Sequence, residues 1–242
     1  MYHSFLKDTK LQGKYVISPM QFDSDLKYLT EKGYTTVLMS DVINYVYNNK
    51  PLPEKPVMIT CDDGYYNNYV YAFPILKKYN AKMVISPIGF YSERDSGADT
   101  LSANYSHIPW DNLREMQKTG LVEVANHSYY MHSQNGARMG IKKKIGESSE
   151  QYKIAITTDI QKMQDLCKQE LSVTPTTFTY PFGAISKDSP QIIKDMGFKA
   201  TLVCKSRVNN ITKDKNCLYD LGRYNRPNGS SSVEFFKKIG IS

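Results

Sequence analysis

Short apolar runs alternate with amphipathic helical patterns along most of the chain, and this alternation limits the possible folds more than any other feature. The apolar runs predict strands over 57–61, 83–88, 121–125, 176–180 and 199–204. The helical patterns predict helices over 21–32, from Asp41 onward, through Tyr69, Phe73 and Leu76, and over 111–118, 149–171, 189–196 and 233–238. Strands that alternate with helices favour parallel pairing and right-handed crossovers. We therefore expect an α/β fold, either a barrel or an open sheet.

The length and composition exclude several classes of protein. The chain has 242 residues, the size of one large domain, and its hydrophobic fraction of 40% and charged fraction of 23% exclude a disordered or fibrous protein. No apolar run approaches the roughly 18 residues of a membrane span, and residues 1–15 lack the apolar core of a signal peptide. We therefore expect either a cytosolic protein or a mature region whose leader has been removed.

Net charge and cysteine spacing narrow the possible partners. The net charge of +7 favours polyanionic surroundings such as nucleic acid or cell wall, but no recognition motif for nucleic acid accompanies it. We therefore expect no nucleic-acid partner. The cysteines include no C-x-x-C pair, which argues against a zinc ribbon or a thioredoxin-type site. Only geometry can decide whether Cys204 and Cys217 form a disulfide.

Polar motifs directly follow three of the predicted strands. The acidic pair Asp62 and Asp63 follows the first strand, His127 and His132 follow the third, and a Pro-Phe-Gly corner at 181–183 follows the fourth. The carboxyl ends of parallel strands meet on one face of an α/β fold, where active sites lie. Each motif alone is a common turn or loop, but their joint occurrence predicts an active site on that face.

The residue types at this face are those of a metal-dependent hydrolase. One carboxylate and two imidazoles are a familiar ligand set for catalytic zinc and leave a position for water. The second carboxylate is what such an enzyme needs as a general base. The spacing of His127 and His132 corresponds to a rotation of about 140° on a helix, so we expect both on a loop. The ligand types favour one zinc ion, with cobalt, nickel and manganese as alternatives.

At these residues the sequence resembles the polysaccharide deacetylase family, also called the NodB-homology or carbohydrate esterase family 4 enzymes. The family's first motif, T-F-D-D-G, is similar to part of LPEKPVMITCDDGYYNNYVYAFPILKKYNAKMVISPIG, where Cys61 replaces the phenylalanine. The second motif and its lead-in helix resemble WDNLREMQKTGLVEVANHS, which runs into His132. The five-residue histidine spacing is similar to that of the branch containing biofilm poly-N-acetylglucosamine deacetylases. The resemblance covers residues 15–236.

The resemblance implies a distorted (β/α) barrel of the NodB-homology type. It implies a polysaccharide deacetylase catalytic domain over 51–242, with an N-terminal helical extension over 1–50 packed on the barrel. Family members remove acetyl groups from N-acetylglucosamine polymers or acetylated xylan, so we expect an acetylated polysaccharide as the partner. We also expect a monomer without a membrane span, located outside the cell or in the cell envelope, where such polymers lie.

The resemblance also implies roles for individual residues. The general base would be Asp62, and the metal ligands would be Asp63, His127 and His132. The third family motif, commonly R-P-P-Y-G, corresponds here to 179–183. By this resemblance the backbone N–H of Phe182 would help to form an oxyanion hole. Substrate contacts are expected from Trp110, Tyr180 and Pro181.

Two departures from the family pattern leave an alternative open. The third motif lacks the arginine that normally steadies the base, and we expect Arg223, in LGRYNRPNG, to replace it. No histidine follows His132, where the family has a general acid, and His107 is better explained as a loop histidine than as that acid. These departures motivate the alternative of a non-catalytic carbohydrate-binding module on a decayed deacetylase fold, whereas the intact base and ligands favour the enzyme. The polar loops 92–106 and 133–147 are expected to select the polymer.

Overall fold

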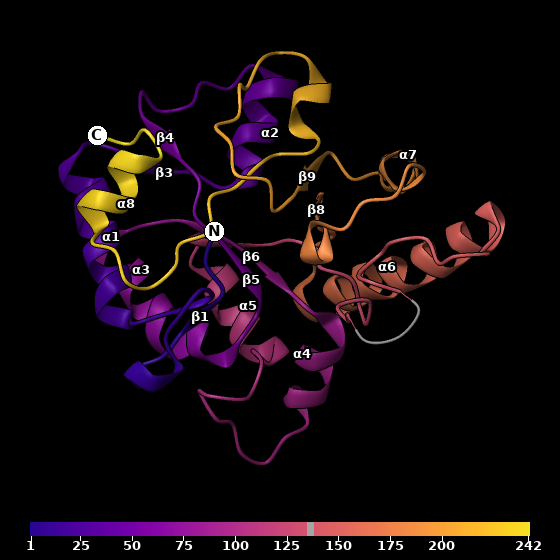
Figure 1. The fold of residues 1–242 in the computed structure, drawn as a ribbon, viewed down its shortest axis with the longest axis horizontal. Helices are drawn as coiled ribbons and strands as arrows, with labels where there is room; N and C mark the ends of the chain where they lie inside the picture. The colour runs from indigo at the N-terminus through magenta and orange to yellow at the C-terminus, as the bar shows by residue number, and fades with distance from the viewer. Residues whose placement is uncertain (135–137) are drawn as a thin grey trace.

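The predicted alternation of strands and helices is present in the computed structural model, which describes residues 1–134 and 138–242 (Figure 1). The strands are β1 (Ser4–Phe5), β2 (Val16–Ile17), β3 (Thr35–Thr36), β4 (Pro56–Val57), β5 (Thr60–Asp63), β6 (Met83–Pro87), β7 (Val122–Val124), β8 (Thr177–Thr179) and β9 (Ala200–Leu202). The helices are α1 (Pro19–Glu31), α2 (Met39–Asn48), α3 (Phe73–Tyr79), α4 (Gly89–Ser96), α5 (Trp110–Lys118), α6 (Ser149–Leu171), α7 (Ser189–Asp195) and α8 (Ser232–Lys238). Every helix and strand predicted from the sequence has a counterpart among them.

Two stretches differ from the prediction. The predicted strand 57–61 is broken, because β4 ends and β5 begins within it. The predicted loop 92–106 begins as the second half of α4. No apolar period marks this helix, since its buried face consists of Gly89, Ser92 and Asp95. The other predicted loop, 133–147, contains no helix or strand in its described part, and residues 135–137 lie outside the described residues.

The strand pairs are parallel, as the alternation predicts, but they form four separate sheets. The largest sheet has the order β5–β6–β7, and the others pair β1 with β2, β3 with β4, and β8 with β9. Isolated parallel bridges join Tyr2 to Cys61, Asn126 to Phe178, and Leu202 to Leu221. These sheets do not form a closed barrel within the described residues. The structure therefore supports a fold of mixed helices and parallel strands and does not confirm the distorted (β/α) barrel.

The first 50 residues share their core with the rest of the chain. Tyr2 and Phe5 pack with Cys61 and other buried side chains of the largest hydrophobic cluster. The N–H of Tyr2 donates to the carbonyl of Thr60 at 2.8 Å, and the N–H of Asp62 donates back to the carbonyl of Tyr2 at 3.0 Å. The N-terminal segment is thus paired with β5. The structure does not confirm an extension packed on the outside, and the domain boundary at residue 50 stays a prediction.

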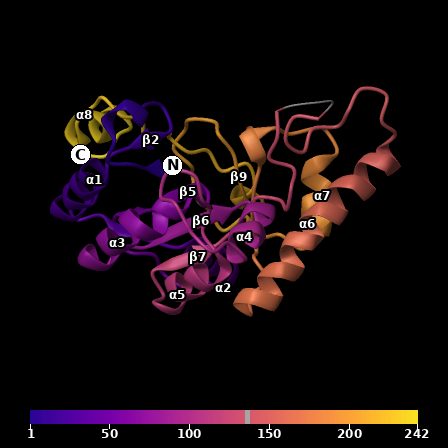
Figure 2. The same cartoon turned by 90° about the horizontal axis from the view of Figure 1, so that it is seen from below.

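Helix α6 is the longest helix and lies along one side of the molecule (Figure 2). It begins with a capping box, in which Ser148 accepts a hydrogen bond from the N–H of Gln151 while the Gln151 side chain accepts one from Ser148. Its buried apolar side chains are spaced three or four residues apart, as in an amphipathic helix: Tyr152, Ile156, Ile160, Met163, Cys167 and Leu171. The helix therefore packs one long face against the core, where Ile156 and Ile160 share a hydrophobic cluster with Phe178 of β8.

The structure also tests two predictions, one on membrane-spanning helices and one on a disulfide between Cys204 and Cys217. Within residues 1–134 and 138–242, no helix is both long and apolar enough to cross a membrane. The four cysteines are free thiols. Cys204 and Cys217 therefore do not form a disulfide.

A fully buried ion pair ties the C-terminal segment to α1. Asp25 and Arg226 both have 0% of their side chains exposed, and Arg226 donates to the two carboxylate oxygens at 2.9 and 3.1 Å. The hydroxyl of Tyr2 donates to the same carboxylate at 3.0 Å. Arg226 also donates to the carbonyls of Pro227 and Ser230. The pair therefore joins the N-terminal strand, α1 and the last part of the chain.

We expect Arg226→Ala to lower the free energy of unfolding by ~3–5 kcal/mol, because Asp25 would stay buried without its cation. Urea denaturation measures the change. Lys27→Ala is the matched control, since Lys27 contacts Glu31 at 3.8 Å on the exposed face of the same helix, and its loss should cost ~0.5 kcal/mol or less. A loss below ~1 kcal/mol for Arg226→Ala would contradict this role of the pair.

Candidate active site

The acidic pair lies at the carboxyl end of β5, where the backbone turns sharply. Asp63 and Gly64 both adopt the left-handed conformation, with φ values of 69° and 70°. This conformation is uncommon for a residue other than glycine and clusters at functional sites. A Cβ at Gly64 would lie 2.7 Å from Cβ and 2.9 Å from Cα of Pro87 on β6. The turn after the two carboxylates therefore requires glycine.

His127 follows β7 on a loop, as the histidine spacing predicts. Its side chain is buried, and its Nδ1 lies 2.7 Å from the carbonyl oxygen of Thr179 at the end of β8. A carbonyl can only accept, so Nδ1 is the donor in this contact and Nε2 is the ring nitrogen that faces the site. This Nε2 lies 3.6 Å from Oδ1 of Asp63. The end of β8 thus orients the ring toward the end of β5.

Three possible metal ligands converge at this point. Nε2 of His132 lies 3.2 Å from Oδ1 of Asp63, and the ligand atoms of Asp63, His127 and His132 all lie within 4.8 Å of one another. Oδ1 of Asp63 is buried and has no hydrogen-bond partner among the described residues. Burial and the neighbouring His127 lower the pKa of His132 to about 4, so its imidazole is neutral at neutral pH. Such a set of facing lone pairs fits a divalent metal ion.

Asp62 lies beside the cluster but is bound in a different way. Two guanidinium nitrogens of Arg223 donate to its two oxygens at 2.6 and 2.7 Å, and both side chains are buried. Arg223 also donates to the carbonyl of Val203 and the hydroxyl of Thr60. Burial by itself would raise the pKa of Asp62, but the charge and hydrogen bonds of Arg223 outweigh it and hold the pKa well below its usual range. The structure thus brings Arg223 to Asp62 and keeps the carboxylate ionised.

The corner after β8 reaches the site only through Phe182, which has a left-handed φ of 57° and a ring centroid 4.2 Å from that of His132. Tyr180 and Pro181 are buried, and Trp110, 4% exposed, packs in the largest hydrophobic cluster. None of these three is among the described residues that line the cavity at the site. Their burial therefore gives no support to the expected substrate contacts from these side chains.

One histidine at the site was not assigned from the sequence. His3 lines the same cavity as Asp62 and His132. Its carbonyl accepts a hydrogen bond from the Asn68 side chain at 2.8 Å, and its ring packs against Tyr15 at 4.8 Å. Burial lowers the pKa of His3. No local pattern marks this residue, because it reaches the site only through the pairing of the N-terminal segment with β5.

His107, the weaker candidate from the sequence, is outside the described lining of this cavity. It is stacked between Tyr65 and Tyr91, with ring centroids at 4.9 and 4.4 Å. Its backbone N–H donates to Asp95 at 2.6 Å, and burial lowers the pKa of its imidazole to about 4. These contacts agree with the interpretation of His107 as a structural loop residue.

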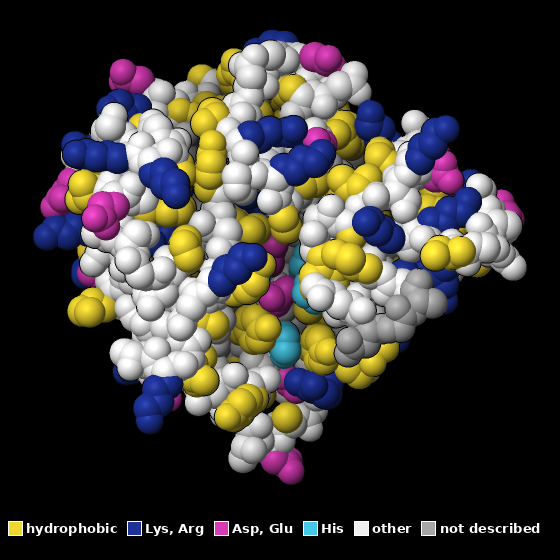
Figure 3. Space-filling view, in the orientation of Figure 1, with side chains coloured by type: hydrophobic (Ala, Val, Ile, Leu, Met, Phe, Trp, Pro, Cys, Tyr) yellow, Lys and Arg dark blue, Asp and Glu magenta, His cyan; other side chains and the backbone are white. Residues whose placement is uncertain are grey.

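The site opens into a cavity of about 780 Å³. Figure 3 shows histidine and acidic side chains in a hollow that is flanked by hydrophobic side chains. Four of the large hydrophobic side chains that are exposed line this cavity: Leu11, Tyr15, Tyr105 and Met139. Tyr105 comes from the predicted loop 92–106 and Met139 from 133–147. A polar floor with an apolar, partly aromatic rim is a surface that suits a sugar chain.

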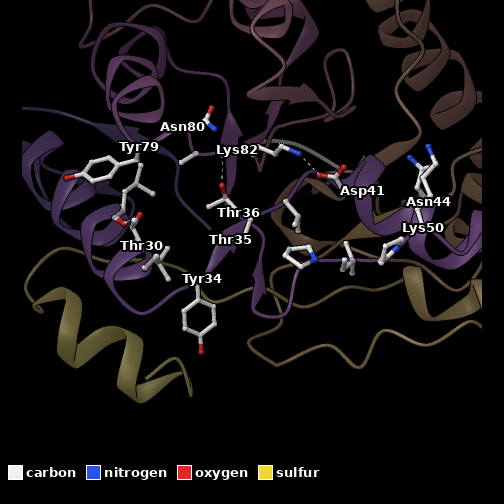
Figure 4. A pocket seen from close by; sticks show the side chains of 17 residues that line it. Thr30, Tyr34, Thr35, Thr36, Asp41, Asn44, Lys50, Tyr79, Asn80 and Lys82 are labelled. Carbon is white, nitrogen blue, oxygen red and sulfur yellow. Dashed lines mark hydrogen bonds and ion pairs between the residues drawn. The ribbon is translucent and has the colours of Figure 1, made fainter.

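A second cavity, of about 540 Å³, lies at the amino end of β6 between α1, α2 and β3. Figure 4 shows Lys82 reaching toward Asp41, with which it forms an ion pair at 2.9 Å. No buried polar atom without a partner belongs to the described residues that line it, and none of the predicted site residues is among them. The chemistry-bearing residues are therefore gathered at the carboxyl end of β5 and not here.

Comparison with known proteins places the chain in a family. The family model "Polysaccharide deacetylase" matches residues 49–201. The chain therefore belongs to the polysaccharide deacetylase family. This confirms the resemblance that the acidic and histidine motifs carry.

Among its relatives is the poly-beta-1,6-N-acetyl-D-glucosamine N-deacetylase of Escherichia coli (strain K12), 26% identical over 230 residues that cover 88% of this chain and 34% of the relative. The enzyme of the same name from Staphylococcus aureus (strain MRSA252) is 29% identical over 195 residues, 81% of this chain and 63% of the relative. The chain thus spans about a third of the first relative and less than two thirds of the second.

Solved structures show the same fold. A de-N-acetylase from Aggregatibacter actinomycetemcomitans superposes with a TM-score of 0.79 at 25% identity, covering 97% of both chains. IcaB from Ammonifex degensii superposes with a TM-score of 0.76 at 25% identity, covering 94% of this chain and 90% of the other. The arrangement of helices and strands is therefore that of the NodB-type deacetylases.

The turn after β5 can be tested with Gly64→Ala. Gly33→Ala is the matched control, because Gly33 has a similar φ of 75° but no atom within 4 Å of an added Cβ. The control should cost ~1–2 kcal/mol for the left-handed conformation alone. Gly64→Ala should cost a further ~1–3 kcal/mol, because its Cβ overlaps with Pro87. Urea denaturation of both variants measures the difference, and equal stability of the two would show that the contact with Pro87 is unimportant.

Proposed function

We propose that this chain is a metal-dependent deacetylase that removes acetyl groups from an N-acetylglucosamine polymer. The observation that carries the proposal is the convergence of Asp63, His127 and His132 beside a buried, ionised Asp62. Three such ligands beside a carboxylate that is not itself a ligand are typical of the active site of a metal-dependent hydrolase. The names of the E. coli and S. aureus relatives support a β-1,6-linked polymer as the substrate.

In this proposal, Oδ1 of Asp63 and the Nε2 atoms of His127 and His132 hold one divalent metal ion. Zinc suits these ligands best, and cobalt, nickel and manganese are alternatives. When bound, the metal would polarise the acetyl carbonyl and lower the pKa of water. Thr179 supports this role, because its carbonyl fixes the protonation of His127 so that Nε2 is free to bind.

Asp62 is the proposed general base. Its two hydrogen bonds to Arg223 fix the orientation of the carboxylate and keep it ionised, so the form that accepts a proton from the attacking water is the one present at neutral pH. Arg223 thereby takes the place of the arginine that is absent from the third motif. The decayed-site alternative gains no support here, because a decayed site has no need for a buried and fully paired base.

Two further groups have proposed roles around the scissile bond. The backbone N–H of Phe182, at a corner that lines the cavity, would donate to the oxyanion as it forms. His3 lies in the same cavity as the base and the metal ligands, and burial lowers its pKa, so it would accept the proton that Asp62 has taken from water and pass it to the leaving amine. His3 thus supplies the histidine that is missing after His132 in the sequence.

The exposed aromatic side chains at the cavity rim support a polymeric substrate. The exposed rings of Tyr15 and Tyr105 offer flat apolar faces to sugar rings on either side of the reacting unit. Polymers of this kind are found in the cell envelope and beyond it, so we place the site of action there. The loops 92–106 and 133–147 at the rim are polar, and beyond the end of α4 at Ser96 their described parts contain no helix or strand, as expected of segments that select a substrate.

We also propose that the four sheets are parts of one distorted barrel. The single bridges between Tyr2 and Cys61, Asn126 and Phe178, and Leu202 and Leu221 support this. Hydrogen bonds from Met1 to Tyr224 and from Arg226 to Met1, at 2.8 and 2.9 Å, would complete the ring. The carboxyl ends of the strands would then surround the metal ligands, as in other α/β barrels.

The direct test is acetate release from β-1,6-linked and β-1,4-linked N-acetylglucosamine oligomers and from acetylated xylan. The protein would first be stripped of metal with a chelator and then assayed with and without added zinc. We expect release that depends on metal and is fastest on the β-1,6-linked oligomer. No release from any substrate by protein with metal bound would contradict the proposal and favour a carbohydrate-binding module.

Substitutions at the site should separate metal binding from turnover. Asp62→Asn should keep the metal but lower kcat by ~10²–10⁴-fold, because a positioned base is lost. His127→Ala should lose both the metal and turnover. Metal content by mass spectrometry and acetate release measure the two effects, with Asp165→Asn on α6, outside the described lining of the cavity, as the control. Wild-type turnover of Asp62→Asn would show that another group is the base.

The rim can be tested with Tyr105→Ala, which removes a ring that is 78% exposed. We expect KM for the oligomer to rise by about 3- to 10-fold, corresponding to ~0.7–1.4 kcal/mol of lost ring contact. The KM for a small aryl acetate should stay the same, because such a substrate does not reach the rim. Tyr45→Ala on α2, outside the described lining of the cavity, is the control. An equal change for both substrates would indicate a general disturbance of the site.

A further inference from the structure

The loop between the two histidine ligands has a partner for each of its backbone N–H groups from 128 to 131. The N–H of Ser128 donates to Oδ1 of Asn126 at 2.8 Å, and that of Met131 donates to the hydroxyl of Ser128 at 3.2 Å. The two N–H groups between them, of Tyr129 and Tyr130, donate to Asp159 at 2.8 and 2.9 Å, one to each carboxylate oxygen. The middle of the loop is therefore held by a single side chain on α6.

Other contacts fix the two ends of this loop to the surrounding helices. The side chain of Asn126 donates to the carbonyl of Ile160 and to Gln164, both on α6, at 3.1 and 3.2 Å. The first N–H groups of α4, from Gly89 and Phe90, donate to the carbonyls of Ser128 and Tyr129 at 3.1 and 2.8 Å. Asp159 is thus the only carboxylate among the described partners of the backbone N–H groups of 128–131, whereas Glu93 accepts from the side-chain hydroxyl of Tyr129 at 2.6 Å.

The position of Asp159 on α6 is itself unusual. It is next to Ile160 and three residues after Ile156, on the side of the helix that packs inward. A carboxylate at such a position normally costs stability unless its oxygens are bound. Here both oxygens accept backbone N–H groups from the loop. Asp159 is half-buried, and its carboxylate therefore lies where it can bind the backbone of the loop.

We propose that Asp159 is a positioning residue that sets the distance between the two metal-ligating imidazoles. His127 and His132 are five residues apart on a loop, and no helix or strand fixes the backbone between them. Ser128 in this loop has a left-handed φ of 68°. The carbonyl of Thr179 already orients His127, so the hydrogen bonds from Asp159 would act mainly on the path of the chain from His127 to His132. This inference rests on the proposed function, because it assumes that the three residues hold a metal.

The test is the zinc affinity of Asp159→Asn, measured by competition with a chromophoric chelator. The amide group keeps the size of the side chain but replaces one acceptor oxygen by a donor, so one loop N–H would face another N–H group. Losses of ~10–100-fold in metal affinity are typical when groups that orient ligands are removed, and we expect about tenfold here. Asp165→Asn is the matched control, since Asp165 lies on the same helix and contacts only Gln161 among its described hydrogen-bond partners.

An affinity of Asp159→Asn within twofold of that of Asp165→Asn would overturn the proposal. Amide hydrogen exchange of the unaltered protein gives a second test that needs no variant. The amides of Tyr129 and Tyr130 should exchange slowly, and exchange as fast as that of exposed loop amides would also overturn it. Failure of the proposed function would give a different result: the wild-type protein would bind no zinc, or would bind zinc without releasing acetate. Neither result depends on the hydrogen bonds between Asp159 and the loop.

Discussion

The ion pair between Asp62 and Arg223 is the interaction on which the site depends. A carboxylate as deeply buried as Asp62 would cost several kcal/mol without a cation and hydrogen bonds on its oxygens. Arg223 supplies both, and it also binds the carbonyl of Val203 at the end of β9. Three residues later, Arg226 forms the buried pair with Asp25. One short segment near the C-terminus therefore neutralises two buried carboxylates and joins the active-site strand to the helix layer.

The remaining residues of the site come from strand ends and from the loops that follow them. β5 ends in the left-handed turn at Asp63, β8 presents the carbonyl that orients His127, and α6 holds the loop that leads to His132. The N-terminal segment adds His3 by pairing with β5. Each proposed ligand is thus fixed by a different element of the fold. A local defect in any of these elements should therefore disturb the proposed metal site.

Much of the fold and of the candidate site could be predicted from the sequence, because the clearest sequence patterns are local. Apolar runs, helix periods and the Asp-Asp-Gly and histidine motifs identify most elements and the metal-ligand candidates. α4 was missed because its buried face is small and polar, and His3 because only long-range pairing brings it to the site. The substrate contacts expected of Trp110 stay a prediction without support from the structure, since a motif does not show that its ring is buried. The division at residue 50 stays a prediction, and the core that residues 1–50 share with β5 depends on long-range contacts that no local pattern shows.

The central claim is that Asp63, His127 and His132 hold one divalent metal ion, and anomalous diffraction tests it most directly. Crystals of the protein loaded with zinc would be measured at the zinc absorption edge. The account predicts a single strong anomalous peak within about 2.0–2.2 Å of one carboxylate oxygen and the two Nε2 atoms. A peak elsewhere on the chain, or no peak in protein that releases acetate from its polymer, would contradict it.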